Sequence, residues 1–258
     1  MFGRKENKTT SIPIDSVNTY KSTSSTNTSY YKAFISVGMV YDDTISKNMV
    51  LRLGLSGNLG QNLTAKQQVT RETFAYDFSG NQVTIDSVYK SAEENGTIKL
   101  PSSFTGGVTL VNIKELKGLR WERSSVGIEY ESTQWADYRF YGQQDKLQNS
   151  WKFRAGGQFI PNATSTNYWN WVSYRAGFYF GKEAINADGN GMNTYSFSLG
   201  AGFPVRKHRS YDNQSTFINT TFELGKRGGS SNAITESFFR FSVGLNLSDV
   251  WFVKRRYD

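Results

Sequence analysis

The sequence has no cysteine, one histidine and four prolines among its 258 residues. The absence of cysteine excludes disulfide bonds and thiolate metal sites. The single histidine, His208, lies in the basic turn VRKHRS and is expected to be solvated. One histidine also leaves too few residues for most transition-metal sites and for His-based catalysis. No apolar run reaches the length of about 18 residues that a membrane-spanning helix needs. The sequence therefore predicts no enzyme activity, no metal and no cofactor.

Apolar content is low and aromatic content is high. Hydrophobic residues make up 37% of the chain, aromatic residues make up 15%, and there are 24 glycines. A soluble core of this size would need more Leu, Ile and Val, whereas the strands of a barrel with a polar lumen give only alternate residues to lipid. The formal net charge of +8 raises nucleic acid as a partner. The basic residues are scattered, however, and no RNA-binding aromatic motif appears, so nucleic acid is not expected.

Alternation of apolar and polar residues dominates the chain. In Met49–Leu59, for example, Leu51, Leu53 and Leu55 share one face and Arg52 lies on the other. Similar alternation occurs in Trp151–Phe159, Val172–Gly181, Tyr195–Phe203, Ile218–Leu224 and Phe239–Leu247, with weaker strands at Tyr31–Tyr41, Gly96–Asn112 and Leu119–Glu131. A tilted membrane-crossing strand needs about ten residues, while strands of soluble sandwiches are nearer five or six. The pattern predicts an all-β, transmembrane antiparallel β-barrel with about nine membrane-spanning strands in this chain.

The expected organisation follows from the strand count. Chains of this class end in the periplasm, so counting back makes residues 1–29 an extracellular loop segment. Residues 30–250 form the barrel, with an extended extracellular hairpin near 60–95, and residues 251–258 form a periplasmic tail. The odd count predicts that the first strand lacks its neighbour and that upstream strands are missing. The alternative is a degenerate strand within 1–29. No signal peptide precedes the polar start, which suggests a mature form or a fragment.

Charged residues on the inward faces are expected to form clusters. Directly opposed residues of an antiparallel hairpin have a constant index sum, and one register pairs Glu131 with Lys152 and Glu129 with Arg154. Two clusters are predicted, and the second pairs Glu223 with Arg240. Arg52 is also expected to face the lumen. The first cluster contains Glu129, Glu131, Lys152, Arg154 and Arg175. A salt-bridged filling of a narrow lumen is favoured, because unpaired buried charges are costly. The alternative is a charged constriction or a site for an anionic headgroup.

Aromatic residues gather near the strand ends. Trp121, Trp169, Trp171 and Trp251 are predicted to form an interfacial girdle. The loop sequence TQWADYRFYG (133–142) could shape an entry pocket, although a girdle or loop-core role is favoured.

Several stretches resemble the FadL-type family of outer-membrane transport proteins, in its divergent branch. They are LRLGLSGNLGQNLTAKQQVTRETF (51–74), GTIKLPSSFTGGV (96–108), TQWADYRFYG (133–142), SWKFRAGGQFIPN (150–162), YRAGFYFGK (174–182) and FFRFSVGLNLSDVWFVKRRYD (238–258). The resemblance implies that the nine strands are the C-terminal part of a 14-stranded barrel. The N-terminal plug of that family is not found in this sequence.

Two functions follow as expectations. The first is uptake of hydrophobic small molecules, such as long-chain fatty acids, across the bacterial outer membrane. The alternative is a non-transporting structural or accessory subunit of a multi-protein outer-membrane complex. The expected partners are outer-membrane lipid, a hydrophobic ligand such as a fatty acid, and other outer-membrane subunits.

Overall fold

The structure, a computed structural model, describes residues 1–14, 20–116, 118–186, 189–205, 215–230, 232 and 234–248. Almost all of its elements are β-strands, and the two helical segments are single 3-10 turns at Trp135–Asp137 and Tyr168–Asn170. All strand pairs are antiparallel within these ranges, so the prediction of an all-β antiparallel chain is confirmed. None of the described helices is long and apolar enough to cross a membrane. The chain divides into two compact units.

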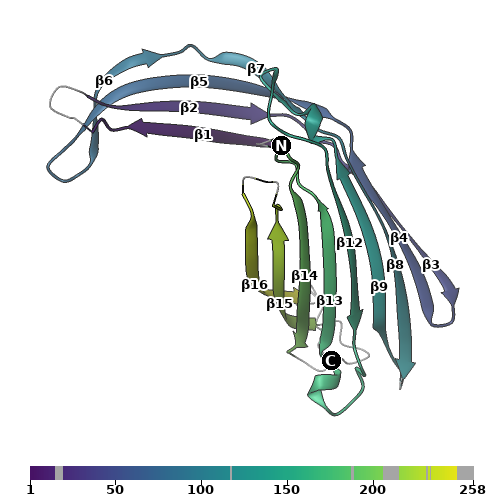
Figure 1. Cartoon of the computed structure of the whole chain (residues 1–258). Coiled ribbons are helices and arrows are strands. Elements are labelled where there is room, and N and C mark those ends of the chain that lie inside the picture. The colour runs from purple at the N-terminus through teal and green to yellow at the C-terminus, as the bar shows by residue number, and fades with distance from the viewer. Residues whose placement is uncertain are drawn as a thin grey trace, which may run out of the picture. The chain divides into compact units, whose positions relative to one another are not determined.

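The larger unit, Ser36–Asn58, Ser102–Trp135 and Lys146–Asp258, contains a nine-stranded sheet in the order β16-β15-β14-β13-β12-β9-β8-β4-β3. Figure 1 shows these strands side by side. Their bounds are β3 Val37–Ser46, β4 Met49–Asn58, β8 Ser103–Leu116, β9 Leu119–Thr133, β12 Ser150–Phe159, β13 Ser173–Lys182, β14 Asn193–Pro204, β15 Ser215–Arg227 and β16 Glu236–Ser248.

The two faces of this sheet differ in chemistry because apolar and polar residues alternate along its strands. One row of directly paired residues crosses all nine strands and is apolar throughout: Tyr41, Leu53, Val108, Ile128, Ala155, Phe178, Phe197, Leu224 and Phe239. We call this side the apolar face. Phe178 and Leu199 on it are 46% and 51% exposed. The opposite side, the polar face, carries the charged residues, among them Asp42, Arg52, Glu129, Arg154, Arg175, Glu223 and Arg240.

The nine-stranded sheet is open within the described residues. Its end strands, β3 and β16, each pair on one side only, with β4 and β15. The side chains of β16 reflect this, since Phe241 is 61% exposed and its direct partner Phe222 on β15 is 42% exposed. The odd strand count correctly predicts that these residues alone do not close a barrel between β3 and β16.

The smaller unit, Met1–Ile35, Leu59–Pro101 and Ala136–Asp145, contains a seven-stranded sheet in the order β1-β2-β5-β7-β10-β11, with β6 also paired to β5. Its strands are β1 Phe2–Ser11, β2 Lys21–Tyr31, β5 Gln61–Tyr76, β6 Gln82–Lys90, β7 Glu94–Leu100, β10 Arg139–Phe140 and β11 Gln143–Gln144. A small core forms where Leu63, Ala65 and Ile98 are buried under Tyr138, Phe140 and Tyr141.

Several expected boundaries differ from the observed ones. The segment 1–29, expected as a loop, contains β1 and most of β2, which pair from Phe2–Tyr31 to Ser11–Ser22. The expected strand Tyr31–Tyr41 is wrong, because β2 ends at Tyr31 and β3 begins at Val37. The single strand expected at Gly96–Asn112 is divided at Pro101, so that β7 and β8 belong to different sheets. Proline has no N–H to donate and explains the break. The tail 251–258 lies outside the described residues, as does His208.

Candidate functional site

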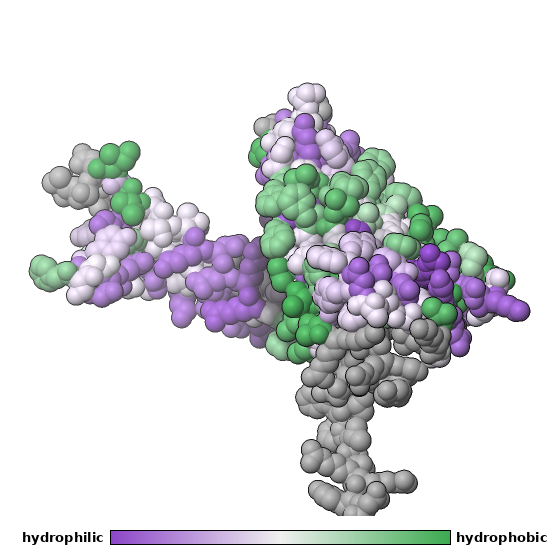
Figure 2. Space-filling model, turned by 90° about the horizontal axis from the view of Figure 1, so that it is seen from below, coloured by the Kyte–Doolittle hydropathy of each residue, from purple (hydrophilic) through white to green (hydrophobic). Residues whose placement is uncertain are grey.

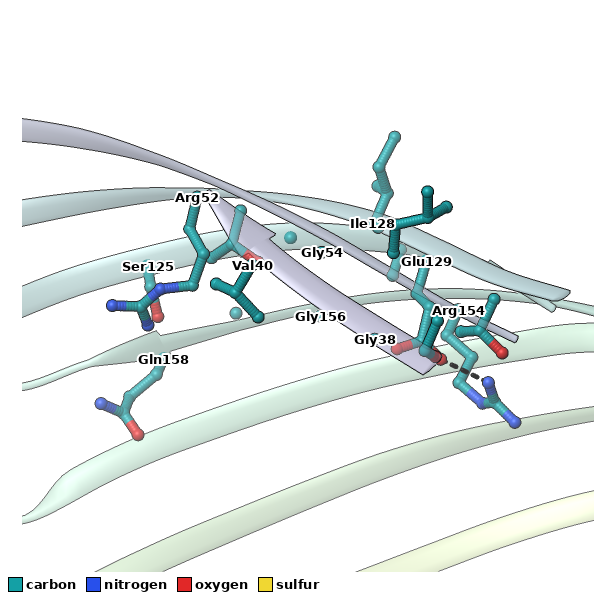
Figure 3. A pocket seen from close by; sticks show the side chains of 18 of the residues that line it. Gly38, Val40, Arg52, Gly54, Ser125, Ile128, Glu129, Arg154, Gly156 and Gln158 are labelled. Atoms are coloured by element: carbon teal, nitrogen blue, oxygen red, sulfur yellow. Dashed lines mark hydrogen bonds and ion pairs between the residues drawn. The ribbon is translucent and has the colours of Figure 1, made fainter. Parts of the chain in front are cut away.

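The polar face of the nine-stranded sheet holds a groove of about 610 Å³. Side chains that line it come from six strands, and they include Arg52, Ser125, Glu129, Arg154, Gln158 and Arg175. Figure 3 shows Arg52, Gln158 and Arg154 on one side of the sheet, whereas Ile128 points to the other side. Glycines from several strands, including Gly54, Gly107 and Gly156, also line the groove. Because they carry no side chain, the groove is open between the charged residues.

Arg154 holds the first predicted cluster together. Its Nη1 bonds to the carboxylate of Glu129, and its Nη2 lies 2.5 Å from Oε2 of Glu131. The register that the sequence predicts is observed, with Arg154 opposite Glu129 and Lys152 opposite Glu131. Lys152 nevertheless turns to another partner, since its Nζ lies 3.6 Å from Oε1 of Glu183. The structure therefore brings three of the five predicted residues into direct contact.

Arg175 does not join this cluster. It lies opposite Gln158, and its Nε and Nη1 donate to Gln158 Oε1 and Asn219 Oδ1, both at 2.8 Å. The predicted position of Arg175 was wrong because the connection between β12 and β13 contains the 3-10 turn Tyr168–Asn170, which lengthens it. Arg154 consequently faces Tyr179 rather than Arg175.

The second predicted cluster forms as a pair. Glu223 lies opposite Arg240, and Nη1 of Arg240 is 3.2 Å from Oε2 of Glu223. Glu223 also accepts a hydrogen bond of 2.8 Å from the Ser196 hydroxyl. Arg52 lies on the same face and makes a two-point contact with Asp42, at 2.9 Å from Nε and 3.0 Å from Nη2.

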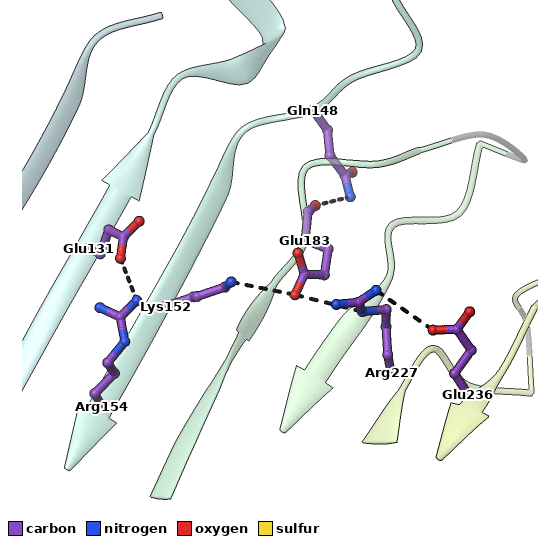
Figure 4. A network of polar contacts seen from close by, with 7 residues as sticks. All are labelled: Glu131, Gln148, Lys152, Arg154, Glu183, Arg227 and Glu236. Atoms are coloured by element: carbon purple, nitrogen blue, oxygen red, sulfur yellow. Dashed lines mark hydrogen bonds and ion pairs between the residues drawn. The ribbon is translucent and has the colours of Figure 1, made fainter. Parts of the chain in front are cut away.

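Four charged residues of the polar face were missed by the sequence reasoning: Asp42, Glu183, Arg227 and Glu236. Figure 4 shows three of them in a network along one end of the sheet. Arg227 lies 3.9 Å from Glu183 and 3.7 Å from Glu236. Arg227 and Glu236 are direct partners in the same register as Glu223 and Arg240. Extending that register along the hairpin would have found them.

The tryptophans expected in a girdle lie in different surroundings. Trp121 is 6% exposed and packs with Ala163 and Ile160, whereas Trp169 is 61% exposed. The Nε1 of Trp171 donates to the Ser165 carbonyl at 2.7 Å, which ties the β12–β13 connection together. Trp251 lies outside the described residues.

The loop 133–142 contributes a core rather than an entry pocket. Tyr138, Phe140 and Tyr141 pack on the buried cluster of the smaller unit. Burial raises the pKa of the Tyr138 phenol, and the nearby Asp145 carboxylate adds to the rise. A charged phenolate is disfavoured there, as expected for a packing residue.

The described ranges contain no group of three or more His, Cys, Asp or Glu residues placed to hold a metal ion. The charged side chains described above on the polar face form ion pairs, except for Arg175, which bonds to the neutral Gln158 and Asn219. The fold and this face define an all-β protein with one exposed apolar face and one ion-paired face. A family model named BamG matches residues 1–258, and the chain belongs to the BamG family. No curated protein and no solved structure matches it.

The resemblance to the FadL-type family is therefore wrong, because BamG is a distinct family and its model spans the whole chain. The error has a physical cause. Alternating strands with aromatic ends are required of any barrel that crosses a bilayer, so they say little about ancestry. The expected lipid transport and the fatty-acid ligand lose their support with it. BamG is a component of the Bam complex, and membership of its family points to the outer-membrane envelope of bacteria.

Proposed function

We propose that this chain is an accessory subunit of the outer-membrane assembly complex and that its role is structural rather than enzymatic. The observation that carries the proposal is the BamG family match across residues 1–258. In this role the protein associates with other Bam subunits and acts through its surfaces, without a reaction of its own.

The nine-stranded sheet supports a position in the outer membrane. Its strands are 10 to 15 residues long, against the roughly 9–11 residues that cross a bilayer. The apolar row described above continues across every strand, and its side chains other than Val108 and Ala155 are 40–60% exposed. In water such a continuous apolar surface would be a liability. Against lipid it is favourable, and the charges stay on the opposite face, where those described are ion-paired except for Arg175.

The open edges of the sheet favour a subunit of an assembly. Unpaired backbone N–H and C=O groups are not tolerated in hydrocarbon, so strands at membrane depth need neighbours on both sides. Within the described residues β3 and β16 each have one. Additional strands are therefore needed to complete the sheet, and upstream strands of the same polypeptide remain one predicted source.

Affinity purification of the epitope-tagged protein from detergent-solubilised outer membranes tests the proposal. The other Bam subunits should copurify in constant ratio, and an unrelated outer-membrane barrel with the same tag should not bring them. Recovery of the protein from the outer membrane without Bam subunits would overturn the subunit role. Recovery outside the outer-membrane fraction would overturn the position of the sheet in the bilayer.

A further inference from the structure

Strand β6 is a free edge of the seven-stranded sheet. It pairs only with β5 within the described residues. Its neighbour along the same side of β5 is β7, and the outer edge of β7 is covered by β10 and then by β11. Strands β10 and β11 lie beside β7, but no described strand lies in the same way beside β6. The outward N–H and C=O groups of β6 therefore lack a described strand partner.

Two bulges change which face the side chains of β6 occupy. The register with β5 shifts twice, and Ile85 and Val88 are the residues that have no partner in it. On one face, Thr84 and Ser87 donate to the carboxylate of Glu72 at 3.5 and 3.3 Å. A bulge places two successive residues on the same side of a strand. Val83, Asp86 and Tyr89 are the partners of Ala75, Thr73 and Arg71 and therefore lie on the other face. With the bulge residues Ile85 and Val88 placed beside Asp86 and Tyr89, that face carries four apolar residues and one charge.

These four apolar side chains are uncovered. They are 49–66% exposed, and Phe78 in the adjoining turn is fully exposed. Figure 2 shows hydrophilic residues over most of the part at the left of the picture and a few separate hydrophobic residues at its far end. Nearer the other end of β5, the same face is covered by the loop that carries Tyr138 and Phe140. An apolar patch on so polar a sheet marks a contact surface.

The edge of this sheet at β1 is protected, in contrast to the edge at β6. Strand β1 carries Arg4, Lys5, Glu6 and Lys8 among its ten residues. Charged side chains on an edge strand oppose pairing with a further strand. Between Val83 and Tyr89, β6 has a single charged residue, Asp86, and neither Pro nor Gly. The edge of β6 therefore carries less charge than that of β1 to oppose a further strand, and its two bulges bend it.

We propose that β6 receives an extended β-strand from another subunit of the complex. Main-chain hydrogen bonds to the free edge would supply the alignment, and burial of Val83, Ile85, Val88 and Tyr89 would supply the affinity. The partner segment has apolar side chains at alternate positions, since those on one side of a strand meet this face. The proposal rests on the subunit role proposed above and identifies the surface that serves it.

Site-specific crosslinking in the purified complex tests the contact. The chain has no cysteine, so an introduced one carries a thiol-linked photo-crosslinker at a single position. Val88→Cys should give an adduct with one other subunit of the complex. The control Thr10→Cys, on the charged edge strand β1, should not give that adduct. A Val88 adduct with a second copy of this chain, labelling of lipid alone, or no adduct in an intact complex would overturn the proposal.

Charge substitution gives an independent measurement. Ile85→Lys together with Val88→Lys should weaken association about tenfold or more, because both side chains lose their buried contact. Thr84→Lys changes the opposite face of the same strand and should leave association within about twofold. If the wild-type chain copurifies with Bam subunits and the double variant does so equally well, this inference fails while the subunit role stands. If the wild-type chain does not copurify, the subunit role itself fails.

Discussion

At the scale of single residues, the polar face is organised by groups that serve two partners each. Arg154 is shared by Glu129 and Glu131, and Glu183 by Lys152 and Arg227. The Glu223 carboxylate accepts from Ser196 on one side and Arg240 on the other. Removing one shared group therefore takes a partner from two charged or polar neighbours at once, whereas removing a whole set leaves no such neighbour behind.

Arg154→Gln tests this arrangement. Glu129 and Glu131 lie on the same face of β9, so without the guanidinium the two carboxylates would repel each other. The three side chains are 35–44% exposed, which moderates the loss of unfolding free energy to about 1 kcal/mol. Urea unfolding in lipid vesicles, followed by tryptophan fluorescence, measures it. The triple variant with Glu129→Gln and Glu131→Gln should regain most of the loss. A triple variant with a lower unfolding free energy than Arg154→Gln would contradict the idea of a shared cation.

Asp77 controls the turn between β5 and β6. The backbone N–H groups of Ser79 and Asn81 donate to its Oδ1 at 2.9 and 2.8 Å, and these bonds lower the pKa of the carboxyl. The charged form therefore stabilises the turn fully above about pH 4, and this support is lost as the pH falls through the lowered pKa. The amide proton shifts of Ser79 and Asn81 should follow that titration. In the variant Asp77→Asn, which keeps the hydrogen-bond acceptor without the charge, the amide proton shifts of Ser79 and Asn81 should not show that titration. An unchanged titration in the variant would assign it to another group.

At the scale of elements, close approach of β12 and β13 requires Gly181. A Cβ at this position would lie 2.2 Å from the Trp151 carbonyl oxygen and 2.8 Å from the Lys152 Cα, both of which are backbone atoms. Gly181→Ala should therefore push the two strands apart and cost about 1–3 kcal/mol of unfolding free energy, as overpacking does. Gly54→Ala is the matched control on the same face, because its Cβ would meet nothing within 4 Å. Equal unfolding midpoints for the two variants would show that the strands can relax around the methyl group.

How far the strands and their registers could be predicted from the sequence depended on the polarity of the strand faces and on the connections between the strands. Seven of the nine strands of the larger sheet were found, because one face of each is apolar and alternation is then visible in the sequence. Strand β3 was misplaced and β8 was merged with β7. Strands β1 and β2 were missed because they are polar on both faces, as KSTSSTNTSYY of β2 illustrates. Registers across the β9–β12 and β15–β16 connections were found from charge pairing. The β12–β13 register was not, because the 3-10 turn at Tyr168–Asn170 gives no alternation signal.

At the scale of the whole molecule, the sheet in the larger unit has a preferred environment on each face. Leu199 lies on the apolar face and is 51% exposed, so Leu199→Arg would place a cation against lipid. We expect a loss of about 2–4 kcal/mol in folding free energy for a site near the bilayer midplane. Thr105→Arg lines the groove opposite Glu131 and should be tolerated. Folding into lipid vesicles, compared by urea midpoint, measures both. A tolerated Leu199→Arg would place this face in water.

The order of the strands along the chain also has a consequence for how the molecule assembles. Strands β4 and β8 pair from Asn58–Ser103 onward, although the residues between them belong to the other sheet. Bringing such distant ends together is slow, because the entropy of closing the loop must be lost before any pair forms. Once β5 has paired with β7 at Gln61 and Leu100, only two residues on each side separate that pair from Asn58 and Ser103. The seven-stranded sheet thus determines when the larger sheet can form, and slowing its folding should delay closure of β4 on β8.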